Sequence, residues 1–528
     1  MSQDQSRENN RVQEGRGASA VAPDPRRWWG LVVIALAQLM VVLDATIVNI
    51  ALPSAQQDLG MSDANRQWVI TAYTLAFGGL LLLGGRIADL VGRKTTFVTG
   101  LVGFALASGL GGAANGPALL FGARALQGAF GALLAPSALS LLTTTFTDGK
   151  ERSKAFGVYG AIAGGGAAIG LITGGLLTEY LDWRWCLYVN IPVALIALAG
   201  ALVFLHDRPD RSRNARLDVP GVLLGCGGLV AIVYGCSEAQ PRGWGDGLVI
   251  GMLVGGAVLL AAFAWWQGRA RYPLLPLHIV RNRNRAGSFL TMGLAVIAMF
   301  GMFLFMTYYF QTVMGYSPVK AGLAFLPMTG AIVIGATQIS ARLLHRLPPR
   351  ALMVPGAFVA AIGLFLLTFL TAHSAYASHV LPSELLVGFG MGLIFMPVVA
   401  SATDGVAPQD AGVTSATLNT SQQVGGSIGT ALLNTIATSA SSRYIPAHLA
   451  DAARSGGAGP GRVPPAVRGG IVKDGVVHGF TVAIAWGAGI MLLAAVIAGL
   501  MVTAKAPKQG PDASQAAPPP VDAGTSAP

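Results

Sequence analysis

The sequence contains few charged residues and few cysteines. Asp, Glu, Lys and Arg make up only 11% of its 528 residues, whereas an ordinary soluble domain is about a quarter charged. The three cysteines, Cys186, Cys226 and Cys236, show no metal-type spacing, which argues against a zinc site and a disulfide framework. The sequence also lacks a G-x-x-x-x-G-K-[ST] phosphate loop and an H-E-x-x-H motif. Their absence disfavours an ATP-driven pump and an intramembrane enzyme.

The sequence is instead rich in apolar residues. They make up 53% of the chain, and the mean hydropathy is +0.58. Segments of about 20 apolar residues match a hydrocarbon core of ~30 Å. Such segments occur at about 31–52, 68–88, 95–114, 117–142, 154–178, 185–205, 219–237, 248–267, 286–310, 321–341, 350–371, 380–403, 412–437 and 479–503. The pattern predicts an all-α integral membrane protein with 14 transmembrane helices, in two six-helix bundles plus two extra helices.

Polar and basic connectors predict the domain boundaries. We expect disordered cytoplasmic tails at 1–27 and 504–528, an N-terminal bundle at 28–205, two linker helices with basic connectors at 206–285 and a C-terminal bundle at 286–503, with an extracellular loop at about 438–478. Short connectors on one side hold eighteen Lys and Arg, against four on the other. The positive-inside rule then places both termini in the cytoplasm. This rule also accounts for the net charge of +11 without a nucleic-acid partner.

An acidic residue, Asp44, lies deep inside the first apolar segment. A carboxylate there costs roughly 2.5–3.5 kcal/mol on insertion scales, so it marks a functional site that faces a cavity or a partner. Arg124 on the fourth segment lies at about the same depth, ~10 Å from the outer face. We expect the two charges to pair, with Asp44 alternating between ion pairing and protonation. The alternatives are an Asp44 at the membrane edge and an Arg124 that ties only to backbone or to Gln127.

A faint internal repeat relates the fourth and twelfth segments. Each begins with a charged residue, Arg124 or Glu384, and has glycine four residues later. Two halves related in this way form many secondary transporters, with the site between them. Glu384 is therefore a second candidate proton or cation site, unless it lies in the outer headgroup region after Pro382.

The stretch GGRIADLVGRK (84–94) resembles the inner-loop motif of the major facilitator superfamily, although Leu90 stands where the family often has a basic residue. Arg124, Gln127 and Gly128 resemble the fourth-helix motif. The stretches LDATIVNIALP (43–53), DWRWCLYVNIP (182–192) and SATLNTSQQVGGSIG (415–429) resemble segments of the 14-helix drug:proton antiporters. The matching residues of the inner-loop motif, the predicted gate, are Gly85, Asp89, Gly92, Arg93 and Lys94.

The fifth-helix antiporter motif, G-P-x-x-G-G, is present as Gly170, Gly174 and Gly175, with Leu171 in place of the proline. The resemblance implies a proton-coupled efflux transporter of antibiotics or other drugs that works by alternating access. It also implies a multi-pass protein of a bacterial inner membrane. Its expected partners are amphipathic or cationic substrates, protons and the lipid bilayer, and not nucleic acid. We expect a monomer with no cofactor beyond the proton gradient. The alternatives are a proton-coupled metabolite symporter and a membrane sensor or regulator.

Two groups of residues are candidates for binding and gating. Methionines and aromatics of the ninth segment suit varied apolar ligands, although lipid contact and an aromatic belt at Tyr308 and Tyr309 are the ordinary alternative. Asp89 is expected to hold a helix N-terminus or to pair with Arg93, closing the inner side in one conformation. The predicted substrate-cavity residues are Asn49, Gln127, Met302, Phe303, Phe305, Met306, Tyr309, Asn419 and Gln423.

Overall fold

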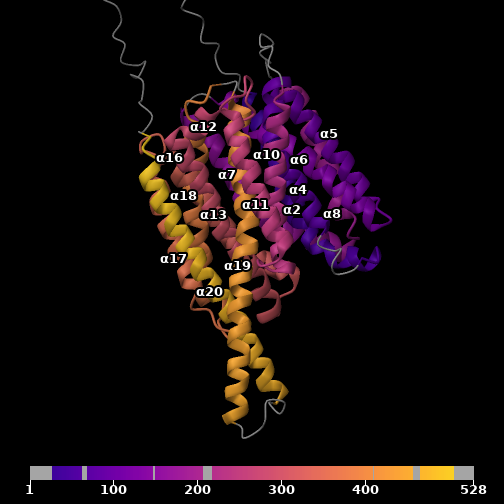
Figure 1. Ribbon diagram of the computed structural model, residues 1–528, viewed down its shortest axis with the longest axis vertical. Coiled ribbons are helices and arrows are strands. Elements are labelled where there is room, and N and C mark those ends of the chain that lie inside the picture. The colour runs from indigo at the N-terminus through magenta and orange to yellow at the C-terminus, as the bar shows by residue number, and fades with distance from the viewer. Residues whose placement is uncertain are drawn as a thin grey trace, which may run out of the picture.

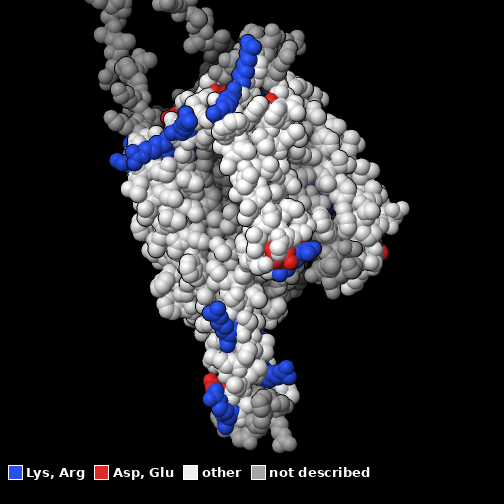
Figure 2. All heavy atoms as spheres, in the orientation of Figure 1, with Lys and Arg blue, Asp and Glu red and all other residues white. Residues whose placement is uncertain are grey.

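The regular structure of this chain is helical throughout the part that the structure describes. The computed structural model describes residues 26–61, 68–146, 149–205, 217–407, 410–455 and 464–504. Within these ranges, twelve helices are long and apolar enough to cross a membrane. Figure 2 shows a broad uncharged band around the middle of the molecule, with Lys and Arg toward its two ends. This distribution of charge fits a membrane-spanning bundle. The tails predicted at 1–27 and 504–528 lie almost wholly outside the described residues.

The N-terminal half is built around α6. Its helices are α2 (Arg27–Asp58), α4 (Trp68–Val91), α5 (Arg93–Gly112), α6 (Pro117–Thr145), α7 (Gly149–Tyr180), α8 (Trp185–Tyr188) and α9 (Asn190–Phe204). Helix α6 packs against α4 and α5, while α2 packs against α7 and α9. The end at which α2 begins and α4 ends is called the inner end below, and the opposite end the outer end.

The linker consists of α10 (Val219–Arg242) and α11 (Gly247–Gln267), which pack against each other. Helix α10 also packs against α4 and α19, so it bridges the two halves. Asp218 caps α10 and accepts hydrogen bonds from Trp266 and Gln267 at the end of α11. Burial opposes ionisation of Asp218, yet these hydrogen bonds keep the pKa of its carboxyl below the ordinary value. The Asp218 carboxylate thus links the start of α10 to the end of α11.

The C-terminal half contains more broken helices than the N-terminal half. Its elements are α12 (Leu277–Arg281), α13 (Arg283–Tyr308), η1 (Tyr309–Val313), α14 (Pro318–Ala324), α15 (Leu326–Val333), η2 (Ile334–Ser340), α16 (Ala341–Leu343), α17 (Arg350–Leu367), η3 (Tyr376–Val380), α18 (Leu381–Thr403), α19 (Ala411–Ser455) and α20 (Pro465–Met501). Helix α18 packs against α15, η2 and α17, and α13 packs against α19 and α20. The halves meet where α4 packs on α19 and α7 on α14 and α15.

The long loop predicted at about 438–478 is instead mostly helical. Helix α19 continues to Ser455 and α20 begins at Pro465, and Figure 1 shows both projecting beyond the rest of the bundle. The rings of Tyr444 and His478 lie 4.8 Å apart across this pair. Packing between two helices therefore overrides the polar composition on which the loop prediction rested. Helices α7 and α19 are not among the twelve apolar candidates, so the count of fourteen spans stays a prediction.

Candidate functional site

Asp44 lies at the centre of a hydrogen-bonded network inside the N-terminal half. Asp44 is fully buried. Arg124 Nη1 donates to Asp44 Oδ2 at 2.6 Å, and Asp44 Oδ1 accepts from Gln127 Nε2 at 2.9 Å and Asn190 Nδ2 at 2.8 Å. The three donors come from α6 and α9, which both belong to the same half as Asp44. The two charges that the sequence placed at one depth are thus in contact.

Arg124 has further partners that fix its position. Its Nε donates to the carbonyl oxygen of Val69 at 3.1 Å, and its Nη1 donates also to Gln127 Oε1 at 2.8 Å. The guanidinium carbon lies 4.4 Å from the ring centroid of Tyr73. A buried ion pair is tolerated when its geometry is good and its remaining polar atoms are hydrogen-bonded. This arginine meets that requirement through α4 as well as α6.

The donors around Asp44 determine what the carboxylate can do chemically. An ionised carboxylate is an acceptor only, with about four lone-pair positions on its two oxygens. Three N–H groups on those oxygens suit the ionised form. A proton on Asp44 would remove the charge that Arg124 faces and so weaken this contact.

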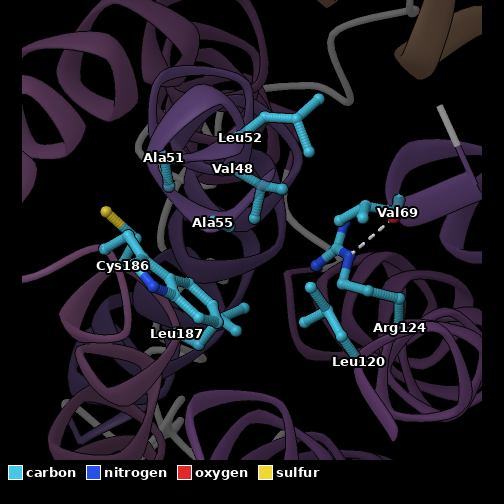
Figure 3. A pocket seen from close by; sticks show the side chains of 10 residues that line it. Val48, Ala51, Leu52, Ala55, Val69, Leu120, Arg124, Cys186 and Leu187 are labelled. Atoms are coloured by element: carbon cyan, nitrogen blue, oxygen red, sulfur yellow. Dashed lines mark hydrogen bonds between the residues drawn. The ribbon is translucent and has the colours of Figure 1, made fainter. Parts of the chain in front are cut away.

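Two polar atoms beside this network have no hydrogen-bond partner among the residues that the structure describes. They are Asn190 Oδ1 and the hydroxyl oxygen of Tyr73, and both are buried. A small void of about 10 Å³ lies next to Arg124, between α2 and residues 183–187 around the start of α8. Figure 3 shows Val48, Ala51 and Leu52 on one side of it and Cys186 and Leu187 on another.

The residues predicted to line a substrate cavity lie in closely packed surroundings in this conformation. Met302, Phe305, Met306 and Tyr309 are buried in the core of the C-terminal half. The Tyr309 hydroxyl donates to the carbonyl oxygen of Thr371 at 2.7 Å. These contacts are those of core side chains, so a cavity role for the ninth segment stays a prediction.

The other cavity candidates are spread over both halves. The Phe303 ring centroid lies 5.0 Å from that of Phe325. Asn419 donates to the carbonyl oxygen of Ser415 on its own helix. Gln423 lies where α19 crosses α4, close to Gly78. Gln127 lies beside Asp44, and its cavity role stays a prediction. The side chain of Asn49 lies outside the described residues.

Glu384 is fully buried within the C-terminal half, in the first turn of α18. The Tyr376 hydroxyl oxygen lies 2.7 Å from the carbonyl oxygen of Ala324 and 3.2 Å from Glu384 Oε2. A phenolic hydroxyl has one proton to donate. If the Tyr376 hydroxyl donates its proton to the carbonyl oxygen of Ala324, it has none left for Glu384. A protonated Glu384 can then donate its own proton to the Tyr376 oxygen. Glu384 Oε1 has no partner among the described residues, which also favours a neutral carboxyl.

The inner-loop motif connects the two halves at the inner end. Asp89 Oδ1 accepts from the backbone N–H of Gly412 at 2.9 Å, and Oδ2 accepts from that of Val413 at 3.1 Å. Both donors lie in the first turn of α19, where a carboxylate is favoured by the free N–H groups and the helix dipole. Arg93 lies 3.7 Å from Asp89 Oδ1. Asp89 thus ties α4 to the first turn of α19 at the inner end.

Neighbouring residues of the motif support this contact between α4 and α19. A Cβ atom at Gly85 would lie 2.5 Å from Ala416 Cβ, so only glycine permits this approach of α4 to α19. Gly92 adopts a φ of 109° at the start of α5, a conformation that favours glycine. Arg93 Nε donates to Ser140 Oγ and Lys94 Nζ to the carbonyl oxygen of Leu202. These contacts hold the start of α5 against α6 and α9 of its own half.

Neutralising Asp89 is expected to open the inner end. In an Asp89→Asn variant, one carboxylate oxygen becomes an NH2 group that faces backbone donors, and the charge assistance to α19 is lost. Hydrogen bonds to charged groups contribute about 1.5–3 kcal/mol, so the inner-closed population should fall roughly tenfold or more. The measurement is the distance distribution between spin labels placed at the inner ends of α4 and α19. An unchanged distribution would contradict a gating role, and Asp451→Asn on the projecting part of α19 is the matched control.

The three glycines of the antiporter motif lie at helix contacts. A Cβ atom at Gly170 would collide with Thr46 Oγ1, and one at Gly174 would lie 2.9 Å from Ile47 Cγ1, both on α2. A Cβ atom at Gly175 would lie 2.8 Å from Val319 Cγ2 on α14. Helix α7 therefore contacts the Asp44 helix on one side and the C-terminal half on another.

Sequence reasoning missed several participants in these networks. Asn190 lies inside the stretch 182–192, which resembled antiporter segments, yet nothing in its spacing identified it as a donor to Asp44. Ser108, which accepts from Gln127 Nε2 at 2.7 Å, is one small residue in an apolar helix and gave no signal. Arg152 donates to the carbonyl oxygen of Thr403 across the halves at 3.0 Å, whereas the sequence counted it only among the inner basic residues.

Comparisons with known proteins agree with these observations. The sequence profile of the Major Facilitator Superfamily matches residues 34–430. The chain is 56% identical, over 92% of its length and 94% of the relative's, to a puromycin resistance protein of Streptomyces alboniger. It is 38% identical, over 80% of its length and 88% of the relative's, to a cephamycin export protein of Amycolatopsis lactamdurans. A solved human organic anion transporter shares the fold, with a TM-score of 0.61 and 12% identity over 90% of this chain and 99% of that chain.

Proposed function

This chain belongs to the Major Facilitator Superfamily, and we propose that it exports an antibiotic-like, amphipathic small molecule in exchange for protons. The observation that carries the proposal is the buried contact between Asp44 and Arg124. Relatives over most of the chain are a resistance protein and an export protein for antibiotics, which supports efflux. The similarity to the puromycin resistance protein makes puromycin the first substrate to test.

The mechanism that we propose makes the charge state of Asp44 depend on the transport cycle. Protonation removes the charge that holds Arg124, and the N-terminal half rearranges. Contacts such as Asp89 with the first turn of α19 then break or form as the access side changes. We place both termini in the cytoplasm and the protein in a bacterial inner membrane, with no cofactor beyond the proton gradient. A monomer is sufficient for this scheme, because both halves belong to one chain.

Proton flux in inside-out vesicles tests the proposal. Vesicles with an acidic lumen are prepared with and without the protein, and puromycin is added outside. Antiport predicts that the lumen pH rises on addition, because protons leave as substrate enters. A metabolite symporter would instead carry substrate and protons in the same direction, and a sensor would move neither. No pH change with puromycin and with a panel of dyes and antibiotics would contradict the proposal.

We propose that Glu384 binds a second proton. A Glu384→Gln variant keeps an N–H donor toward the Tyr376 oxygen, so folding should be retained, but it cannot release a proton. The number of protons moved per substrate should fall by about one, measured by simultaneous proton and radiolabelled-substrate fluxes. An unchanged ratio would limit Glu384 to a structural role. Tyr376→Phe serves as a comparison, since it removes the hydrogen bond and keeps the acid.

A further inference from the structure

An exposed apolar stripe runs along α11. Ile250, Val254 and Val258 follow one another at four-residue spacing, and Trp265 lies seven residues further on. All four residues are exposed, and Trp265 exposes 58% of its surface. Residues at these spacings share one face of a helix, and an exposed apolar patch marks a surface that contacts a partner or a membrane. On a spanning helix, this stripe is a surface for lipid acyl chains.

The stripe leads to the inner end of the bundle. Trp68 at the outer start of α4 contacts Tyr234 in the later part of α10, with ring centroids 6.2 Å apart. Helix α10 therefore begins at the inner end. Helix α11 ends there, because Gln267 at its end donates to Asp218 at the start of α10. Trp265 thus lies near the level at which interfacial tryptophans meet lipid headgroups.

An arginine continues the stripe beyond its last apolar residue. Arg269 lies four residues after Trp265, and its guanidinium carbon is 4.2 Å from the centroid of the Trp265 ring. Stacking on an indole face orients a guanidinium without neutralising its charge. Apolar surface and positive charge are thus adjacent here, as the acyl chain and the phosphate of an anionic phospholipid are.

The connector after α11, residues 268–282, folds back beside Arg269. The backbone N–H of Leu275 donates to Gln267 Oε1 at 2.9 Å. A Cβ atom at Gly268 would lie 3.5 Å from Leu277 Cδ1, so the first residue of α12 packs against the residue that precedes Arg269. The connector is therefore an ordered part of the inner surface.

The side chains of this connector are divided between the core and the surface. Leu274 and Ile279 are fully buried, whereas Arg269, Arg271 and Arg281 are exposed. The apolar residues hold the chain against the bundle and leave the arginines on its surface. Figure 2 shows Lys and Arg side chains at the end of the molecule where α12 lies in Figure 1.

These three arginines form no ion pair with any residue that the structure describes. The surrounding sequence contains no acid that could supply one, since no Asp or Glu occurs between Asp246 and Glu384. Two carboxylates of other segments have partners of their own. Asp218 accepts hydrogen bonds from the end of α11, and Asp410 contacts His278 at 3.2 Å. The charge of the connector is therefore available to a partner outside the chain.

We propose that the end of α11 and the connector at 268–282 bind an anionic phospholipid of the leaflet at the inner end. An acyl chain lies along the α11 stripe and against Trp265, and the phosphate binds Arg269 together with Arg271 and Arg281. Each basic residue beside a spanning helix strengthens the attraction to anionic lipid about fivefold. A free phosphate would use the charge alone and leave the stripe uncovered, which favours a lipid. This inference does not depend on the proposed export activity.

Lipid binding by the purified full-length protein tests this site. Delipidated protein in a neutral detergent is titrated with phosphatidylglycerol or phosphatidylcholine, and the bound lipid is counted by native mass spectrometry. Arg269→Gln/Arg271→Gln/Arg281→Gln should weaken binding of the first phosphatidylglycerol at least tenfold. The matched control, Arg342→Gln/Arg346→Gln/Arg350→Gln, removes three other exposed arginines and should change it less than threefold. Equal losses in the two triple variants, or equal binding of both lipids to the wild type, would overturn the site.

Two further measurements distinguish a lipid from a soluble anion. Trp265→Ala should weaken phosphatidylglycerol binding at least threefold, whereas Trp486→Ala, which removes another exposed tryptophan on α20, should leave it unchanged. Glycerol 3-phosphate at the same concentration should not displace the bound lipid. Full displacement by glycerol 3-phosphate, or wild-type binding in Trp265→Ala, would overturn a lipid site. The melting temperature of each variant before lipid is added serves as the check on folding.

Discussion

Asp44→Asn is expected to reduce substrate-driven proton movement to the background of empty vesicles, a loss of at least a hundredfold. Asparagine has the same size and keeps one acceptor oxygen, but it cannot take up or release a proton. It also leaves the buried Arg124 without its counter-charge. Proton flux in inside-out vesicles is the measurement, with puromycin as the first substrate and the amount of protein in the membrane determined in parallel.

Asp44→Asn is also expected to destabilise the protein, and a double variant separates this effect from the loss of proton movement. Removing one partner of a buried ion pair costs about 3–5 kcal/mol, because the other charge is left uncompensated. Asp44→Asn/Arg124→Gln removes both charges and should recover most of the thermal stability that Asp44→Asn loses. It should not recover proton flux. Flux at the wild-type rate in either variant would contradict proton coupling at Asp44, and Asp451→Asn is the exposed control.

The contact between Asp44 and Arg124 was predictable because depth follows from counting residues. The fixed rise of a helix and the thickness of the bilayer place both side chains ~10 Å from the outer face. Depth does not show which side of its helix a residue faces. It therefore could not distinguish a site between the halves from one inside a single half. The sequence placed the site between the halves, whereas every side chain that donates to Asp44 belongs to one half.

Other features depended on packing that no sequence pattern describes. The helices and the membrane class followed from apolar runs of sufficient length. The continuation of α19 through 438–455 did not, because its polar composition is typical of a loop and its pairing with α20 is long-range. Similarly, Met302 and Met306 have the character of an adaptable ligand surface, but the structure buries them in a core. The two partners predicted for Asp89, a helix N-terminus and Arg93, both lie beside its carboxylate, but no sequence pattern indicated which helix would supply the N-terminus.

Gly170→Ala is expected to reduce export at least tenfold while the protein remains folded. A Cβ atom at Gly170 would collide with Thr46 Oγ1, and Thr46 lies two residues from Asp44 on α2. Overpacking of this kind costs about 1–3 kcal/mol, and here it has to be relieved by moving α2 away from α7. Such a shift displaces Asp44 relative to Arg124 on α6. Puromycin accumulation in cells and proton flux in vesicles are the measurements.

Two further variants make this steric interpretation testable. Thr46→Ala removes the hydroxyl oxygen that the new methyl group would meet, so Gly170→Ala/Thr46→Ala should recover a large part of the lost export. Recovery remains incomplete, because the Cβ atom of residue 46 and the carbonyl oxygen of Leu43 each lie 3.2 Å from the added methyl group. Gly251→Ala on α11 is the matched control, since a Cβ atom there meets nothing within 4 Å. Wild-type export in Gly170→Ala, or no recovery in the double variant, would mean that close packing of α7 on α2 does not control the Asp44 site.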